Sequence, residues 1–199
     1  MGLDHRIGGK FLHAGPGFGG SCFPKDLAAL VQTGERVGYP FQIASAAAKV
    51  NHEQHLRMVV KIREACGGLA GKTLGVLGLS FKPNTNDMRE APSLTILKEL
   101  MKEGATVRAY DPVAMEEAAK LIPGMIPCKE AYDVAENADG LIIMTEWNQF
   151  RNLDFDRLKQ TMRQRLLLDL RNVYDSDRVT GHGFRHVSVG RPTREPRPA

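Results

Sequence analysis

The sequence contains little cysteine. Three cysteines occur in 199 residues, widely spaced at Cys22, Cys66 and Cys128. An odd number at these spacings fits neither a disulfide framework nor a zinc site, and it suits a reducing compartment. We therefore expect no bound metal, and we expect Cys66 and Cys128 to be packing residues.

Long hydrophobic runs are also missing. No apolar stretch approaches the roughly 20 residues that span a bilayer, and no charged-then-apolar leader precedes a small-residue cleavage site. With 42% hydrophobic and 25% charged residues, the composition is that of a globular chain with a buried core. We expect a cytoplasmic protein of one or two domains without a membrane partner.

The chain has no strong excess of one charge. Much of the formal net charge of +4 lies in residues 191–199, whose Arg- and Pro-rich composition predicts a disordered tail. Elsewhere acidic and basic residues are interleaved, without the alternation of aromatic and basic residues that suits stacked bases. Nucleic acid is therefore not an expected partner.

A glycine-rich run that ends in a cysteine is the most informative feature present. Residues 15–26 read GPGFGGSCFPKD, and four glycines in six positions indicate positive φ angles or close approach to a ligand. Pro24 and the apolar spacing after it predict a helix that begins just after Cys22, where the helix dipole favours a thiolate. With Lys25 as a nearby cation and Asp26 as a proton acceptor, Cys22 is predicted to be a nucleophile. The alternative is a buried structural cysteine.

One long helix is predicted from Phe41 to about Cys66. This stretch is rich in alanine, lacks Gly and Pro, and has apolar residues at helical spacing. Within it, His52 and His55 are expected to be exposed rather than to form a metal pair. The glycines of residues 67–71 then predict a hinge.

Strands and helices alternate after the hinge. This order predicts an α/β fold with a Rossmann-like, doubly wound parallel sheet. We expect strands at 73–79, 105–110, 140–145, 166–170 and 186–189, and helices at 93–103, 114–121, 130–137 and 155–162. Ligands of such sheets bind beyond the carboxyl ends of the strands, so Lys82 and Arg89 in the loop after the first strand are candidate phosphate ligands. The alternative is a solvated basic loop.

The dinucleotide fingerprint is not satisfied in this sheet. Residues 75–80, GVLGLS, do not fit G-x-G-x-x-G, and Asp111 lies more than 30 residues beyond Gly78 instead of about 20. A nucleotide sugar therefore fits this domain better than NAD.

Two sequence blocks resemble one known family in the same order. Residues 4–26 and residues 78–92 (GLSFKPNTNDMREAP) are similar to the central segment and the start of the carboxy-terminal domain of the UDP-glucose/GDP-mannose dehydrogenase family. The family pattern usually has aspartate at Asn86 and serine at Ala91. The resemblance implies that residues 1–68 are part of a central domain with the cysteine loop and an α-helical dimerisation segment. It likewise implies that residues 69–190 form a UDP-sugar-binding domain.

The resemblance also implies roles for individual residues. Cys22 resembles the covalent nucleophile, Asp26 a residue that assists proton transfer or the hydrolytic water, and Lys25 their neighbour. Arg6 is similar to an arginine that reaches the sugar nucleotide of the neighbouring subunit. NAD contacts are implied for Cys22, Lys25 and Arg89. Contacts with the sugar nucleotide are implied for Phe11, Leu12, His13, Ala14, Gly15, Pro16, Gly17, Phe18, Gly19, Phe81, Lys82 and Arg171.

The reaction implied is an NAD-dependent, two-step oxidation of UDP-glucose to UDP-glucuronate through a thiohemiacetal and a thioester on Cys22. Family members bind NAD in an amino-terminal domain that these residues do not resemble, so we expect the chain alone to be inactive. A homodimer through helix 41–66 is also implied. The alternatives are a UDP-sugar-binding or dimerisation module without activity of its own, and a related GDP-mannose or UDP-N-acetylhexosamine dehydrogenase.

Overall fold

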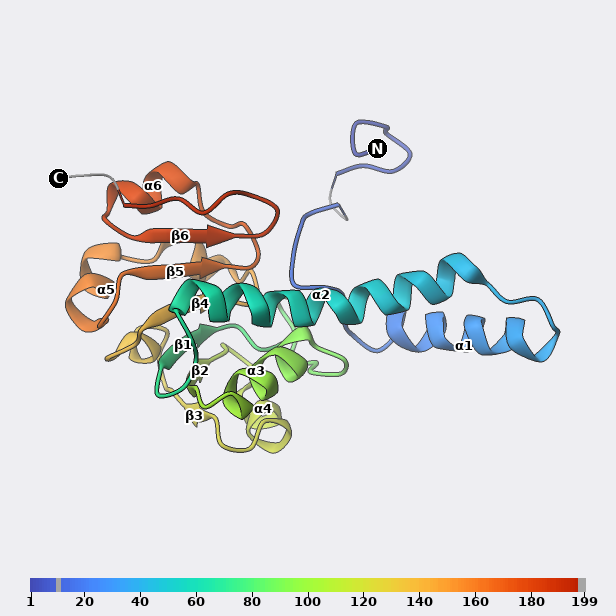
Figure 1. Ribbon diagram of the computed structural model, residues 1–199, viewed down its shortest axis with the longest axis horizontal. Coiled ribbons are helices and arrows are strands. Elements are labelled where there is room, and N and C mark those ends of the chain that lie inside the picture. The colour runs from blue at the N-terminus through green and yellow to red at the C-terminus, as the bar shows by residue number, and fades with distance from the viewer. Residues whose placement is uncertain (10–11, 197–199) are drawn as a thin grey trace.

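A pair of helices projects from an α/β body in the computed structural model, which describes residues 1–9 and 12–196 (Figure 1). The pair consists of α1 (Phe23–Arg36) and α2 (Gln42–Cys66). Pro24 lies in the first turn of α1, and α2 ends at Gly67, which has a left-handed φ of 67°. Both predicted helices are confirmed, and α2 continues from the projecting pair onto the sheet.

A parallel sheet forms the body, as predicted. In the described part of the chain six strands pair, all parallel, in the order β3-β2-β1-β4-β5-β6. This is the doubly wound order, in which the strand order reverses between β1 and β4. The strands are β1 (Thr73–Leu77), β2 (Thr106–Tyr110), β3 (Ile126–Pro127), β4 (Gly140–Ile143), β5 (Leu166–Asp169) and β6 (Arg185–Ser188). The α/β fold class is thereby confirmed.

Hydrophobic side chains cover both faces of the sheet. Leu166 and Leu168 of β5 pack on one face, with α2, α3 (Pro92–Lys102) and α4 (Met115–Leu121). Leu167, between them, packs on the opposite face with α5 (Phe155–Thr161) and α6 (Ser176–Gly181). Successive strand residues point to opposite faces, so a strand covered on both sides is apolar throughout.

The helix predicted at 130–137 is reduced to a single 3₁₀ turn, η1 (Asp133–Ala135). The Arg108 guanidinium donates two hydrogen bonds to the Asp133 carbonyl oxygen, at 3.2 and 2.8 Å, and so takes an acceptor that a continuing helix would use. Asn137, with φ of 53°, then turns the chain. The short elements β3, η2 (Asn148–Asn152) and α6 were not predicted.

The tail differs from the expected disorder over its described part. Backbone hydrogen bonds pair His186 with Arg194 in both directions, at 2.8 and 2.9 Å, in an antiparallel bridge along β6. The Arg185 guanidinium also pairs with Glu195 at 2.9 Å. The composition of the tail predicted disorder, but composition does not show which backbone groups are available for pairing. The edge strand β6 has unpaired backbone groups, and the tail binds to them. Among the described residues, no helix has both the length and the apolar character needed to cross a membrane.

Candidate functional site

Cys22 lies in the open at the start of α1. It is the N-cap residue of the helix, and its thiol is exposed, with Sγ 3.7 Å from the Ser21 hydroxyl. Lys25 and Asp26, one turn further, form an exposed ion pair of 3.3 Å with each other. The predicted helix start is confirmed, and the thiol is accessible from solvent. The role of the three side chains as a catalytic group stays a prediction.

The glycines before Cys22 allow the loop to lie against three other parts of the protein. A Cβ at Gly15 would lie 2.8 Å from the Arg171 guanidinium, and one at Gly17 would lie 2.6 Å from Nε2 of His55. A Cβ at Gly19 would overlap the Glu90 carbonyl oxygen, and one at Gly20 would meet the Phe81 ring at 2.8 Å. In this structure the close approach inferred from the glycines is therefore to protein groups.

The cysteine loop is joined directly to the loop after β1. The Gly20 amide donates a 2.8 Å hydrogen bond to the Arg89 carbonyl oxygen. Glu90 has a left-handed φ of 50°, a conformation that costs energy for a residue with a Cβ. The two long sequence motifs thus meet, although 69 positions separate Gly20 from Arg89.

Basic side chains of the loop after β1 lie beside this junction. The Arg89 guanidinium donates hydrogen bonds of 3.0 and 2.8 Å to the two carboxylate oxygens of Asp87, and this pairing lowers the Asp87 pKa. The pKa of Arg89 is raised, chiefly by its hydrogen bond to Asp87, with a smaller contribution from the charge of Cys22. The Lys82 ammonium lies 5.3 Å from the centre of the Phe81 ring. Arg89 and Cys22 therefore share one electrostatic environment.

Arg171 approaches the cysteine loop from another strand. It follows the carboxyl end of β5, and its guanidinium forms a hydrogen-bonded ion pair with Glu146 next to Gly15. Arg171 and Lys82 thus follow β5 and β1, at the edge of the sheet where ligands of such folds bind. The structure brings Arg171, Phe81 and Arg89 to the same loop of residues 15–22, and Lys82 lies over the Phe81 ring.

Asp111 tests whether the sheet itself fits a dinucleotide. It directly follows β2, where Rossmann domains carry the carboxylate that binds a ribose. Here its Oδ2 atom accepts hydrogen bonds from the Leu79 and Ser80 amides, the Ser80 hydroxyl and the Trp147 indole. The side chain is almost completely buried. Because these donors belong to the protein, Asp111 has little capacity for a ribose, and the residues of this sheet do not fit the adenosine half of NAD.

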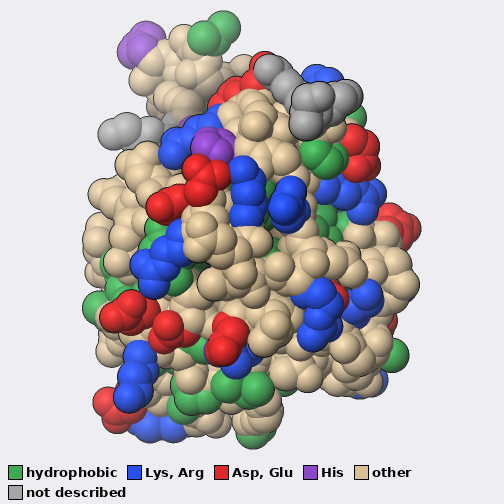
Figure 2. Space-filling model, turned by 90° about the vertical axis from the view of Figure 1, so that its left-hand side faces the viewer, with side chains coloured by type: hydrophobic (Ala, Val, Ile, Leu, Met, Phe, Trp, Pro, Cys, Tyr) green, Lys and Arg blue, Asp and Glu red, His purple; other side chains and the backbone are tan. Residues whose placement is uncertain are grey.

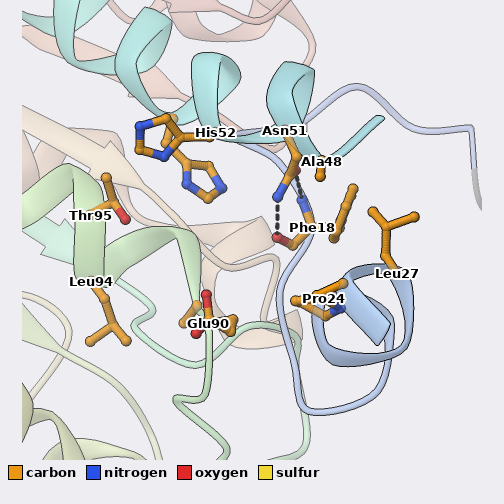
Figure 3. A pocket seen from close by; sticks show the side chains of 12 residues that line it. Phe18, Pro24, Leu27, Ala48, Asn51, His52, Glu90, Leu94 and Thr95 are labelled. Carbon is orange, nitrogen blue, oxygen red and sulfur yellow. Dashed lines mark hydrogen bonds between the residues drawn. The ribbon is translucent and has the colours of Figure 1, made fainter. Parts of the chain in front are cut away.

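Two polar side chains of α2 hold the cysteine loop, a role that was not predicted from the sequence for either of them. Asn51 accepts a hydrogen bond of 2.8 Å from the Phe18 amide and donates one of 3.0 Å to the Phe18 carbonyl oxygen (Figure 3). Gln54 donates a 2.9 Å hydrogen bond to the Gly15 carbonyl oxygen. The signal available in the sequence is their spacing on one face of the predicted helix.

His55 is buried, so the expectation that it is exposed was wrong. Its side chain lies behind Gly17, and neither ring nitrogen has a hydrogen-bond partner among the described residues. Burial, and to a smaller extent the charge of His52, lowers the His55 pKa. His52 itself is exposed, as expected. Both rings line a cavity of about 230 Å³ between α1, α2 and α3, together with Glu90 and Thr95 (Figure 3).

The segment before Gly15 is less closely attached to the site. Leu12, His13 and Ala14 are exposed, and the Arg6 guanidinium pairs with Asp4 at 2.6 Å. Figure 1 shows this amino-terminal segment standing away from the helix pair. The contact predicted between Arg6 and a neighbouring subunit stays a prediction. Phe11, a predicted substrate contact, lies outside the described residues.

Neither of the other two cysteines offers a second accessible thiol. Cys66 and Cys128 are buried, as predicted, and burial raises the Cys66 pKa to about 11. The described residues contain no group of three or more His, Cys, Asp or Glu side chains that could hold a metal ion. On the face of the body turned away from the helix pair, Lys and Arg are interspersed with Asp and Glu (Figure 2).

Comparisons with protein families identify both halves of the chain. Residues 75–176 match the UDP binding domain of the UDP-glucose/GDP-mannose dehydrogenase family, and residues 1–53 match the central domain of the same family. Residues 54–74 lie between the two matches, and they comprise the second half of α2, the turn that follows it and the start of β1.

Similar proteins and structures agree with this result. The chain is 52% identical over 193 residues to a UDP-glucose 6-dehydrogenase of Rhizobium meliloti, covering 96% of the chain and 44% of that protein. It is 41% identical to UDP-glucose 6-dehydrogenase TuaD of Bacillus subtilis, covering 96% of the chain and 42% of that protein. A UDP-glucose dehydrogenase structure from Pyrobaculum islandicum superimposes with a TM-score of 0.80 at 37% identity, covering 95% of the chain and 41% of the other. The chain thus spans less than half the length of these relatives.

Proposed function

Since this chain belongs to the UDP-glucose/GDP-mannose dehydrogenase family, we propose that it is the cysteine-bearing and UDP-sugar-binding part of an NAD-dependent UDP-glucose 6-dehydrogenase. The observation that carries the proposal is the hydrogen bond from Gly20 to Arg89. It brings an accessible thiol next to the basic loop at the carboxyl end of β1, where a nucleotide sugar would bind in a sheet of this type. The name of the Rhizobium meliloti relative supports the choice of UDP-glucose.

The proposed substrate lies along the cysteine loop. Arg171, oriented by Glu146, contacts the uridine nucleotide, and Lys82 contributes a point charge to the pyrophosphate. Phe81 and the exposed residues Leu12, His13 and Ala14, with the main chain of Gly15 to Gly19, border the sugar. The sugar then extends toward Cys22, whose exposed thiol offers an open approach.

The proposed chemistry oxidises the sugar C6 alcohol twice. In the first oxidation C6 loses a hydride and its hydroxyl loses a proton, which gives an aldehyde. The Cys22 sulfur then forms a bond to the aldehyde carbon, and the oxygen takes a proton, which gives a thiohemiacetal. Loss of a second hydride and a proton leaves a thioester. Attack by water, assisted by Asp26, breaks the carbon–sulfur bond and releases the carboxylate and the thiol.

Two molecules of NAD, one for each oxidation, would accept the two hydrides. Arg89, Cys22 and Lys25 are the residues of this chain that we propose contact NAD, because Arg89 is exposed and lies beside the cysteine. The saturated Asp111 argues against an adenosine site on the sheet, so most of the cofactor would be held by other residues of a complete enzyme.

A cytoplasmic homodimer is the proposed working form. The proposed contact is the helix pair, because α2 exposes apolar side chains that soluble surfaces usually carry singly. Ile43 and Val50 are 89% and 52% exposed. The chain by itself is expected to be inactive.

Two other functions make different predictions. A binding or dimerisation module would bind UDP without any response to NAD even when the enzyme is completed. A related dehydrogenase would bind GDP-mannose or a UDP-N-acetylhexosamine in preference to UDP-glucose.

Calorimetric titration separates these functions. The purified chain is titrated with UDP, UDP-glucose, UDP-N-acetylglucosamine and GDP-mannose. A protein completed with the amino-terminal half of a relative is titrated with UDP-glucose with and without NAD, and a module would show no difference between these two titrations. We expect UDP-glucose to bind more tightly than GDP-mannose, and Arg171→Ala to weaken both UDP ligands by at least about tenfold, because a charged hydrogen-bonding group is worth roughly 1.5–3 kcal/mol. Arg151→Ala, which removes an exposed arginine of η2, is the matched control. Preferential binding of GDP-mannose, or no binding of any nucleotide sugar, would reject the proposal.

A further inference from the structure

The main chain of Phe18 is held by one side chain. The Asn51 amide satisfies both its N–H and its carbonyl oxygen, at 2.8 and 3.0 Å, in the manner of a neighbouring β-strand (Figure 3). Three residues lie between Phe18 and Cys22, and Phe18 is the one residue of this loop to which Asn51 is hydrogen-bonded among the described residues. Two hydrogen bonds to the main chain of one residue fix both the place and the orientation of that residue.

The Phe18 ring contacts the residue that follows Cys22. It packs against the ring of Phe23 with centroids 5.1 Å apart, and Phe23 is the first residue of α1 and the residue after Cys22. Phe23 is otherwise 65% exposed, so its ring has few other contacts. A displacement of Phe18 would therefore displace the first turn of α1.

Asn51, which holds Phe18, belongs to a helix that is packed into the core. Asn51 is in the middle of α2, and the carboxy-terminal half of this helix is packed into the core through Met58, Val59 and Ile62. One turn along the same face, Gln54 holds the Gly15 carbonyl oxygen, and His55 fills the space behind Gly17. Residues at i, i+3 and i+4 of a helix share one face, so the loop is seated on a single surface of α2.

We propose that Asn51 is a positioning residue, which sets where Cys22 lies relative to the Lys82 and Arg89 loop by holding Phe18. The inference rests on the proposed function in assigning Cys22 and that loop to one site. Asn51 does not touch the substrate in this proposal. It acts through Phe18 by two routes. One is the contact of the Phe18 ring with Phe23, the neighbour of Cys22, and the other is the main chain of Gly19 and Gly20, which is hydrogen-bonded to Arg89.

Amide hydrogen exchange measured on the chain tests this coupling. In Asn51→Ala we expect the Phe18 and Gly20 amides to exchange about tenfold faster, which corresponds to about 1.4 kcal/mol in the opening equilibrium. The Gly78 amide, which bonds to the Tyr110 carbonyl oxygen in the body, reports any general loss of stability and should not change. Lys49→Ala, at an exposed position of the same helix, is the matched control.

The Gly20 amide decides the result. Its acceptor is on Arg89, not on Asn51, so a purely local role of Asn51 would leave its exchange at the wild-type rate and overturn the proposal. Asn51→Asp keeps an acceptor for the Phe18 amide but loses the donor, so it should show a smaller increase at both amides. This second variant decides the question if Asn51→Ala does not fold.

Alkylation of Cys22 separates this inference from the proposed function. Iodoacetamide should react with Cys22 first, because Cys66 and Cys128 are buried, and UDP-glucose should protect it. If the wild-type chain is not protected, the proposed substrate site is contradicted, and the exchange of Gly20 still decides the role of Asn51. If the wild type is protected, Asn51→Ala should need at least about threefold more UDP-glucose for half protection. Equal concentrations for the two proteins would overturn the positioning role.

Discussion

At the scale of single residues, Cys22 is distinguished from the other two cysteines by its surroundings. It lies at a helix N-terminus in contact with solvent, whereas the Cys66 thiol is buried and has a pKa raised to about 11. A thiol reacts as the thiolate, so burial makes a cysteine inert and exposure beside positive groups makes it reactive. We therefore expect Cys22 to react before the two buried thiols.

Replacing the sulfur atom of Cys22 by oxygen tests whether this residue is the nucleophile. In a protein completed with the amino-terminal half of a relative, Cys22→Ser should abolish formation of the uronic acid, because a serine adduct would leave an ester that water cleaves poorly. Cys128→Ser is the control, since this thiol is buried away from the loop. Acid release is followed by chromatography of the nucleotide sugars, and an unchanged rate in Cys22→Ser would refute covalent catalysis by this residue.

The lowered pKa of His55 predicts that the free energy of unfolding decreases in mild acid. The folded-state pKa of His55 lies below the value of about 6.5 for an unfolded histidine, so the unfolded chain takes up the proton first. The free energy of unfolding is therefore fully retained above about pH 6.5 and falls as the pH decreases below it, until the folded-state pKa is reached. Of the side chains that line the cavity, His52 and Glu90 are the other titratable groups.

The pH effect is measured by denaturant unfolding between pH 8 and pH 5. We expect a flatter dependence in His55→Gln than in the wild type. His5→Gln, on the exposed amino-terminal segment, should keep the wild-type dependence. Equal slopes for the wild type and His55→Gln would mean that the buried ring does not contribute.

Sequence reasoning predicted Cys22 as the reactive residue, but it did not predict which side chains hold the cysteine loop. Cys22, Lys82, Arg89 and Arg171 carry charge or reactive chemistry, which a sequence displays directly. Asn51 and Gln54 act through amides that bind main chain, and such side chains look like ordinary polar residues of a helix until the loop is seated on them. The buried state of His55 depends on Gly17, a contact between positions 38 residues apart.

At the scale of elements, the strongly periodic segments were predicted well and the short ones were not. The helices α1 and α2 and the central strands have patterns long enough to fix their type. The predicted helix at 130–137 failed because Arg108, on a neighbouring strand, captures the Asp133 carbonyl oxygen. β3 has two residues, too few to show any alternation.

Ala91 leaves the start of α3 without a side-chain cap. It has the extended backbone of an N-cap residue, and no side-chain hydrogen bond satisfies the first amides of the helix. Ala91→Ser should raise the free energy of unfolding by roughly 0.5–1 kcal/mol, since its hydroxyl would accept a bond from one of these amides. Thermal and urea unfolding measure the change. Ala91→Val lacks the hydroxyl and should not stabilise; an equal gain in both variants would exclude capping as the cause.

Gly19 is required by the contact between the cysteine loop and Glu90. A Cβ at this position would overlap the Glu90 carbonyl oxygen, which belongs to a backbone already in a left-handed conformation. Gly19→Ala should therefore destabilise the loop, at a cost of about 1–3 kcal/mol for forced overpacking. Gly181→Ala meets no atom within 4 Å, and in helix α6 it should be neutral or stabilising. Exchange of the Gly20 amide and urea unfolding report the difference, and identical behaviour of the two variants would contradict it.

At the scale of the whole molecule, the tip of the projecting helix pair has little internal packing. Tyr39 and Ile43, near its tip, are 68% and 89% exposed, while the opposite end of α2 is buried on the sheet (Figure 1). A helix pair that covers so little of its own apolar surface is suited to a partner, and the proposed partner is a second copy of the chain.

Association through the helix pair is tested by charge substitution. The double variant Ile43→Glu and Val50→Glu should shift the protein toward the monomer in sedimentation equilibrium, because a buried glutamate without a partner is costly. Val113→Glu adds a charge at a position that is 53% exposed on the body, and this control should leave the mass unchanged. A dimer that survives the double variant would require a different interface.

The chain near Arg194 turns back antiparallel to β6 and covers part of the sheet edge, through two backbone hydrogen bonds at His186. Backbone groups that would otherwise invite another molecule to add a strand are already occupied there. Anyone who engineers this protein should accordingly leave residues 191–196 in place, since shortening the chain to Gly190 would open a seam along which molecules can join into fibrous aggregates.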